Sequence, residues 1–227
     1  MSGTETFLAG DGFGSRTFYK VVRFIVTAFC RTYMRMTIEG RENIPSTGAF
    51  VLAPVHRSYI DTPIASGCTS RRMRFMGKDS LWTKQPFRWI LSALGSFPVT
   101  RGSADREAIL RCIKVLEGGE PLVLFPEGER KEGPVVQPLF DGAAYVACKA
   151  GVPIVPVGIG GSELVMGKRH KVPHPRKVHV IIGKPLPVPV AIDGRMPRSA
   201  VKEISTMLHA ELQRLFDQAQ ARVGIKN

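Results

Sequence analysis

The fold is decided by the stretch Ala49-Phe-Val-Leu-Ala-Pro54, a short apolar run that is followed by a turn and then by Thr62-Pro63. A continuous apolar run of this length, bounded by turn residues, predicts a strand that is buried on both faces. Proline suits the first turn of a helix, so Thr62-Pro63 predicts that a helix begins soon after the strand. A strand followed at once by a helix is the repeating unit of α/β proteins.

The same alternation continues toward the C-terminus. Further strands are expected at residues 73–76, 96–99, 121–125, 153–157 and 177–182. Helices are expected at 80–94 (with Pro86 as a break), 103–117, 142–149 and 199–222, with loops at 126–140 and 183–197. We therefore predict an α/β fold with a largely parallel central sheet flanked by helices, in a single domain over residues 39–227.

The N-terminal segment, residues 1–38, has a different character. Residues 1–14 are expected to be disordered, and residues 15–37 are expected to form an amphipathic helix. Its polar side chains recur three and four residues apart, at Arg16, Lys20, Arg23, Thr27 and Arg31, and all but Thr27 are basic. Its apolar side chains lie opposite, at Phe18, Val22, Ile25, Val26, Phe29, Tyr33 and Met36. This pattern is typical of an interfacial, membrane-docking helix; the alternative is a helix packed on its own domain with a solvated basic face.

The chain has 227 residues, of which 32 are Lys or Arg and 19 are Asp or Glu, so its formal net charge is +13. Such a charge predicts an anionic partner: a nucleic acid, an anionic membrane surface or a phosphorylated substrate. The basic residues are dispersed and match no nucleic-acid-binding motif, so no nucleic acid is expected. No secretory signal and no apolar run of about 20 residues occurs, and the protein is expected in the cytosol or on a membrane surface.

Cysteines and histidines give no sign of a metal site. The four cysteines, Cys30, Cys68, Cys112 and Cys148, are far apart in the sequence, as expected of small buried side chains in a reducing compartment. Three histidines have a metal-like spacing, at residues 170, 174 and 179, but the prolines at 173 and 175 prevent the helix that would align them. We expect the first two on a solvated loop, the third facing outward from a strand, and no metal.

Chemically capable residues follow the expected strands, and α/β proteins place their sites at such strand ends. His56 and Asp61 can meet if His56 lies in the turn after its strand and Asp61 lies in the first turn of the helix. The carboxylate would then fix the imidazole tautomer and leave the other ring nitrogen as a general base. The alternative is a loop histidine beside an aspartate that caps a helix.

Two further strand ends carry charged residues. Phe125-Pro-Glu127-Gly-Glu-Arg130 places a carboxylate on a tight glycine turn, where Glu127 could bind a hydroxyl or orient an arginine. Arg130 could hold a phosphate through a bidentate contact, and Arg101 is a second candidate for such a contact. The alternatives are an ordinary surface turn with a charge pair and a solvated surface arginine.

Together these segments resemble the PlsC-type 1-acylglycerol-3-phosphate (lysophosphatidate) acyltransferase family. That family carries His-x4-Asp, Gly-x5-Arg-Gly, Phe-Pro-Glu-Gly-x-Arg and Val-Pro-x-x-Pro-Val. All four patterns occur here in that order within residues 56–157. In place of the family's common Thr and Ser, this chain has Glu129 and Lys131, and Phe140-Asp141 stands where a Lys is common. These departures leave the details of acceptor recognition open.

The resemblance implies roles for particular residues. It implies that His56 is the general base and Asp61 its partner, and that Arg101 and Glu127 bind the glycerol-phosphate acceptor. It also implies that Arg130, and in a looser match Lys78, lie at the acceptor phosphate.

The activity implied is transfer of a fatty acyl group from a thioester to the free hydroxyl of lysophosphatidate, giving phosphatidate. The donor would be acyl-CoA or an acyl carrier protein thioester, with no other cofactor. The remaining alternatives are acceptors such as glycerol 3-phosphate, another lysophospholipid or a glycolipid. The family's lipid product favours the interfacial interpretation of residues 15–37, and hence a peripheral protein on an anionic membrane, at the cytoplasmic face of the cell membrane.

Overall fold

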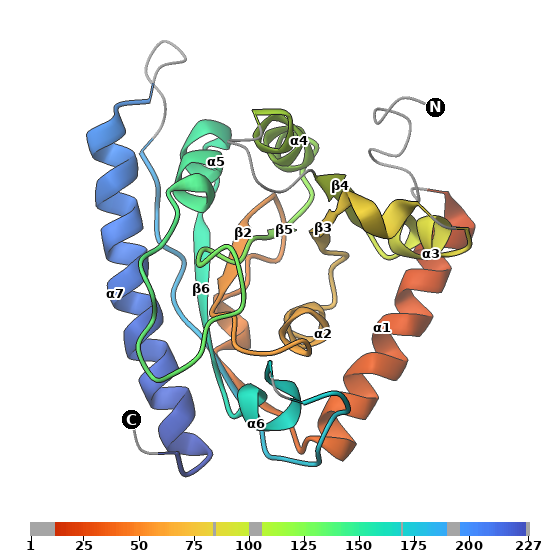
Figure 1. Cartoon of the computed structure of the whole chain (residues 1–227). Helices are drawn as coiled ribbons and strands as arrows, with labels where there is room; N and C mark the ends of the chain where they lie inside the picture. The colour runs from red at the N-terminus through yellow and green to blue at the C-terminus, as the bar shows by residue number, and fades with distance from the viewer. Residues whose placement is uncertain (1–11, 84, 100–105, 169, 190–195, 226–227) are drawn as a thin grey trace.

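The computed structural model describes residues 12–83, 85–99, 106–168, 170–189 and 196–225 (Figure 1). Its centre is a seven-stranded sheet in the order β1-β7-β6-β2-β5-β3-β4. The strands are β1 (Thr37–Glu39), β2 (Val51–Pro54), β3 (Arg74–Lys78), β4 (Ser96–Val99), β5 (Leu122–Val123), β6 (Ile154–Gly160) and β7 (His179–Ile182). Each pair of neighbours is parallel except β6 and β7, which are antiparallel, so the predicted α/β fold with a largely parallel sheet is confirmed.

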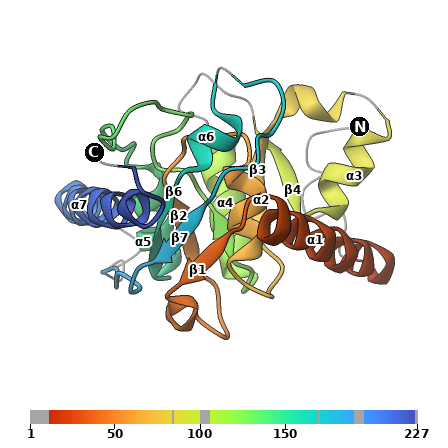
Figure 2. The same cartoon turned by 90° about the horizontal axis from the view of Figure 1, so that it is seen from below.

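Helices cover both faces of this sheet. They are α1 (Phe13–Tyr33), α2 (Asp61–Gly67), α3 (Phe87–Ala93), α4 (Arg106–Glu117), α5 (Gly142–Ala150), α6 (Ser162–Met166) and α7 (Arg198–Arg222). One group, α4, α5 and α7, lies on one side of the sheet, and the other, α1, α2 and α3, lies on the opposite side (Figures 1 and 2).

The central strands are buried because helices pack on both of their faces. In β2 the side chains of Val51, Leu52 and Ala53 are completely enclosed, as the continuous apolar run predicts. On β6 the long helix α7 packs so closely that a Cβ atom at Gly158 would lie 2.4 Å from the backbone of Leu215. Glycine on this strand therefore allows the helix backbone to approach the sheet.

The N-terminal helix differs from the prediction in its bounds and in its faces. It ends at Tyr33 rather than at residue 37, and residues 37–39 form β1 beside β7. The boundary expected at residue 38 thus falls inside a strand. The buried side chains of α1 include Tyr19 and Cys30, and Arg23 turns toward the domain, where it donates to the Thr69 carbonyl at 3.1 Å. Most of residues 1–14, for which disorder is expected, lie outside the part of the chain that the structure describes. The helix, however, already begins at Phe13.

On the solvent side of α1 an apolar stripe is exposed, formed by Val21, Phe24, Ile25 and Phe29. Among the described helices, none combines the length and the apolar character that crossing a bilayer requires.

Two other features depart from the sequence prediction. Helix α6 was not expected, and β7 was expected to carry an outward-facing His179. That side chain is instead buried, and its Nδ1 atom lies 2.6 Å from Thr37 Oγ1 of the neighbouring strand. Burial lowers the pKa of His179 below its ordinary value, because desolvation disfavours the imidazolium, and nearby Glu39 only partly offsets this. All four cysteines are buried with free thiols, as predicted.

Candidate active site

The two residues of the first motif meet at the carboxyl end of β2. His56 lies in the loop between β2 and α2, and Asp61 is the first residue of α2. The Nδ1 atom of His56 is 2.9 Å from Oδ2 of Asp61, and this carboxylate is completely buried. The same Oδ2 atom accepts the backbone N–H groups of Arg57 and Ser58, both at 2.6 Å. Two backbone hydrogen bonds thus fix the aspartate before it reaches the imidazole.

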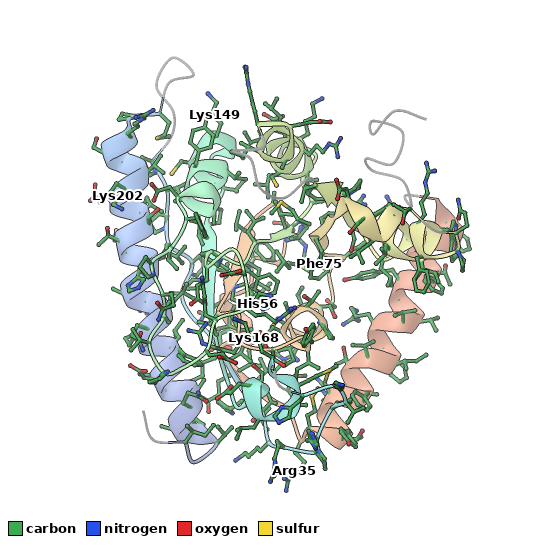
Figure 3. All side chains as sticks on the ribbon, in the orientation of Figure 1. Arg35, His56, Phe75, Lys149, Lys168 and Lys202 are labelled. Atoms are coloured by element: carbon green, nitrogen blue, oxygen red, sulfur yellow. The ribbon has the colours of Figure 1, made fainter. Side chains whose placement is uncertain are left out.

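This contact determines which nitrogen of His56 is available. A buried carboxylate accepts a hydrogen bond from Nδ1–H, so the neutral ring carries its proton there and Nε2 keeps a free lone pair. The ring also stacks on Phe125, with centroids 4.0 Å apart and planes inclined by 22°. The side chain is 13% exposed, and Figure 3 places it in the middle of the molecule. An oriented imidazole with one accessible basic nitrogen can act as a general base.

The second loop of the site follows β5. Gly128 has a φ of 73°, which favours glycine, and a Cβ atom there would lie 2.7 Å from the ring of Phe140. This turn directs Glu127 into the protein, where its carboxylate is 0% exposed. Its Oε1 and Oε2 atoms accept hydrogen bonds from Arg57 Nη1 at 2.9 and 2.7 Å. They also accept the backbone N–H groups of Gln137, at 3.0 Å, and of His56, at 3.1 Å.

Arg57 was missed by the sequence analysis. Its side chain is only 1% exposed, and its guanidinium lies 4.9 Å from the ring centroid of Phe216 on α7. Besides Glu127, it donates to the His56 carbonyl at 3.1 Å and to the Val135 carbonyl at 3.2 Å. No sequence signal marks it, because an arginine next to a motif histidine is as easily solvated as buried. Of the two roles considered for Glu127, its internal contacts are those of a carboxylate that orients an arginine.

The predicted phosphate-binding residues are only partly described. Arg130 is half-buried, and its guanidinium stacks over Tyr59, 3.6 Å from the ring centroid. The backbone N–H of Lys131 donates to the His56 carbonyl at 2.9 Å, so Arg130 lies next to the loop that carries His56. Lys78 ends β3, but its side chain lies outside the described part of the chain, as does all of Arg101.

Two of the residues that depart from the family pattern pair with each other. Lys131 Nζ lies 2.8 Å from Glu129 Oε1, on the exposed part of this turn. This pair takes the place of the family's common Thr and Ser, and its glutamate side chain is exposed.

An apolar cavity of about 640 Å³ opens beside the His56–Asp61 pair. It lies between the sheet and helices α4 and α5, and its wall includes Phe125, the residue on which His56 stacks. Other wall residues are Phe75, Met76, Val99, Ile109, Cys112 and Val146. Its size falls in the range of small-molecule sites, about 300–1,000 Å³. An apolar cavity of this size beside an oriented imidazole suits a substrate with a long hydrocarbon part.

Comparison with known proteins supports the same assignment of family. Residues 35–160 match the family model described as Acyltransferase. The 1-acyl-sn-glycerol-3-phosphate acyltransferase of Bacillus subtilis is 30% identical over 150 residues, which cover 66% of this chain and 72% of the relative. The chloroplastic 1-acyl-sn-glycerol-3-phosphate acyltransferase of Arabidopsis thaliana is 30% identical over 161 residues, 68% of this chain and 44% of the relative.

The chain spans just under half the length of the plant and algal relatives that it matches. The crystal structure of the 1-acyl-sn-glycerophosphate acyltransferase PlsC from Thermotoga maritima superposes with a TM-score of 0.76. That match covers 96% of this chain and 87% of the other at 24% identity, and it shows a shared fold. The family model spans more than half of the chain and includes all four motifs. The chain therefore belongs to the PlsC-type acyltransferase family.

Proposed function

We propose that the protein transfers a fatty acyl group from a thioester to the free hydroxyl of lysophosphatidate and so forms phosphatidate. The observation that carries this proposal is the position of the His56–Asp61 pair beside the apolar cavity. Phe125 connects the two, because it stacks on His56 and also forms part of the cavity wall. The Arabidopsis thaliana and Bacillus subtilis relatives are named 1-acyl-sn-glycerol-3-phosphate acyltransferases, which supports this acceptor.

The reaction is a direct transfer that His56 assists. Nε2 takes the hydroxyl proton of the acceptor as its oxygen attacks the thioester carbonyl carbon. Asp61 keeps the ring in place and stabilises the imidazolium that forms. When the tetrahedral intermediate collapses, the carbon–sulfur bond breaks and the imidazolium gives its proton to the departing thiolate. The new carbon–oxygen bond completes the ester, and His56 returns to its neutral form.

The acceptor phosphate is proposed to bind at Arg130, with Lys78 and Arg101 as further contacts. Arg130 lies beside the catalytic loop, and its Nε atom is buried without a hydrogen-bond partner in the described part of the protein. A planar guanidinium that already stacks on Tyr59 is pre-oriented for a bidentate phosphate contact. The acyl chain of the donor, acyl-CoA or an acyl carrier protein thioester, would occupy the apolar cavity.

The protein is also proposed to dock on an anionic membrane as a peripheral protein of the cytoplasmic face. The exposed stripe of α1 is flanked by Lys20 and Arg31, the arrangement that favours an interfacial helix. Helix α3 extends this face, because Phe18 of α1 packs against the exposed Trp89 at a centroid distance of 5.1 Å. Aromatic side chains of this kind prefer the membrane–water interface.

An acyl-transfer assay tests the proposed function. Purified protein is given lysophosphatidate and a series of acyl thioesters, with glycerol 3-phosphate, other lysophospholipids and glycolipids as competing acceptors. We expect phosphatidate as the principal product and a rate about 10²–10⁴-fold lower in the His56→Ala variant. Preferential acylation of another acceptor would refute the lysophosphatidate assignment, and a folded His56→Ala variant that keeps most of its activity would refute the mechanism.

A further inference from the structure

We propose that Arg57 and Glu127 form a buried positioning pair that fixes the backbone of His56, and that Glu127 acts through this pair and makes no contact with the acceptor. The proposal rests on the proposed function, because it assigns the pair to the same acyl transfer. It gives Glu127 a different role from the acceptor binding that the motif resemblance implies.

The pair forms hydrogen bonds with both the backbone N–H and the backbone carbonyl of His56. Glu127 Oε2 accepts the His56 N–H at 3.1 Å, and Arg57 Nη1 donates to the His56 carbonyl at 3.1 Å. The ion pair itself closes this ring of contacts, with Nη1 2.7 Å from Oε2. The imidazole is therefore held at its backbone by Glu127 and Arg57 and at its Nδ1 atom by Asp61. Nε2 is the ring nitrogen left for chemistry.

Arg57 also joins the parts of the site that come from different segments. Its backbone N–H binds Asp61, while its side chain binds Glu127 on the turn after β5. Its Nη2 atom donates a hydrogen bond to the Val135 carbonyl, and the backbone N–H of Gln137 donates one to Glu127. One residue thus links the loop after β2, the turn after β5 and the loop that follows it.

Glu127 has no capacity left for an acceptor hydroxyl in this arrangement. Its carboxylate is fully enclosed, and the two oxygens share four hydrogen bonds with Arg57, His56 and Gln137. An acceptor could reach it only after Arg57 had left, which would leave both charges buried and uncompensated. Breaking a buried ion pair in this way is strongly destabilising.

Stability alone is a weak reason for such a pair. Removing two charges from water costs about as much as their attraction returns, so apolar side chains of similar volume often serve the fold equally well. A pair whose hydrogen bonds all end on His56 or on the loops around it is better explained by the geometry that it imposes.

The test uses Glu127→Gln and Arg57→Lys in the full chain, with steady-state kinetics for both substrates. Glu127→Gln keeps the shape and an accepting oxygen but removes the charge that holds Arg57. We expect kcat to fall about 100-fold, the scale associated with a displacement of about 1 Å at a reacting group. The KM values for lysophosphatidate and for the thioester should stay within about threefold of the wild-type values. A raised KM for lysophosphatidate with an unchanged kcat would instead show that Glu127 binds the acceptor and would overturn the proposal.

A double-mutant comparison shows whether the pair acts through His56. In the His56→Ala background, Glu127→Gln should cause no further loss of the residual rate, because the group that it positions is gone. Full additivity of the two losses would overturn the proposal. If Glu127→Gln does not fold, Arg57→Lys can replace it in the same experiments. Lysine keeps the positive charge but lacks the planar guanidinium that binds Glu127 and the His56 carbonyl together.

The matched control is a second ion pair of a buried arginine, Arg74 with the partly exposed Glu120, whose Nε and Oε2 atoms are 2.5 Å apart at the start of β3. Arg74→Gln should lower thermal stability and leave kcat unchanged. If Glu127→Gln behaves in the same way, the pair is merely structural and the proposal is wrong. If the His56→Ala variant retains its activity, the proposed mechanism is wrong. If His56→Ala is inactive but Glu127→Gln has normal activity, the mechanism stands and only the positioning proposal is wrong.

Discussion

Nδ1 of His56 lies 2.9 Å from Oδ2 of Asp61, although the two residues are five positions apart and would not be neighbours on a regular helix. They meet because the chain turns between β2 and α2. Within this turn, the N–H groups of Arg57 and Ser58 bind the same carboxylate oxygen. The backbone of the turn therefore sets the direction of Asp61, and Asp61 sets the direction of the imidazole.

Replacing His56 by alanine should lower kcat by about 10²–10⁴-fold, the usual contribution of a general base. The fold should persist, because the side chain makes a single hydrogen bond among the described residues and Asp61 keeps its two backbone donors. Thermal unfolding and circular dichroism check the fold, and product formation checks the rate. A folded variant with most of its activity would contradict the assignment.

Replacing Arg130 by alanine should weaken the binding of the phosphorylated acceptor much more than that of the thioester. A hydrogen bond to a charged group contributes about 1.5–3 kcal/mol, so we expect the KM for lysophosphatidate to rise roughly 10- to 100-fold. The neighbouring Lys131→Ala is the control, since its ammonium pairs with Glu129 on the exposed part of the turn. Equal increases in KM for both substrates after Arg130→Ala would exclude a phosphate contact.

The sequence predicted the parts of this molecule that have a local pattern. The buried strands around Leu52 and Val155 are continuous apolar runs, and each is enclosed in the structure. By contrast, β1 has only three residues at an edge of the sheet, and its sequence Thr-Ile-Glu gives no apolar run to detect. Helix α6 is a single short turn of five residues, too short to show a helical period.

The candidate site divides in the same way. The pairing of His56 with Asp61 follows from a turn that the strand and helix signals already place. The burial of Arg57 does not follow from any local pattern, because it depends on the turn after β5 and on Phe216 of α7, which the fold brings together. For the same reason the sequence could not choose between a hydroxyl and an arginine as the partner of Glu127.

A larger side chain in place of Cys112, in the cavity wall, should make the protein prefer donors with shorter acyl chains. Cys112 lies on α4 and faces the cavity, so Cys112→Phe removes room for the end of the chain. Each methylene that can no longer be buried costs about 0.8 kcal/mol, or about a fourfold loss in kcat/KM for long donors. Competition between acyl thioesters of different length measures the shift. Leu110→Phe, on the exposed face of the same helix, should leave the preference unchanged, and an unchanged preference in Cys112→Phe would place the chain elsewhere.

Charge substitutions on the exposed stripe of α1 should reduce binding to anionic vesicles. Burying an apolar side chain of this size contributes about 1.5–3 kcal/mol, so Phe24→Glu should weaken binding about 10- to 100-fold in a sedimentation assay. Deleting the segment is a poorer experiment, because Tyr19 and Cys30 of the same helix are buried in the domain. Met207→Glu, on the exposed side of α7, is the control. Equal binding by Phe24→Glu and wild type would rule out docking through this face.

The thiols should be unreactive in the native protein, and acyl transfer should not depend on them. Burial raises the pKa of Cys30 to about 11 and the pKa values of Cys68 and Cys112 to about 12, and it also raises the pKa of Cys148. A raised pKa means less thiolate at a given pH, so at pH 8 only about one Cys112 side chain in 10⁴ would carry the nucleophilic form. An acyl-cysteine intermediate is therefore disfavoured, in agreement with direct transfer assisted by His56. Native protein treated with iodoacetamide at pH 8 should keep its full activity, whereas denatured protein should be alkylated at all four positions. Rapid inactivation of the native protein, with alkylation of a single cysteine, would point to a covalent mechanism instead.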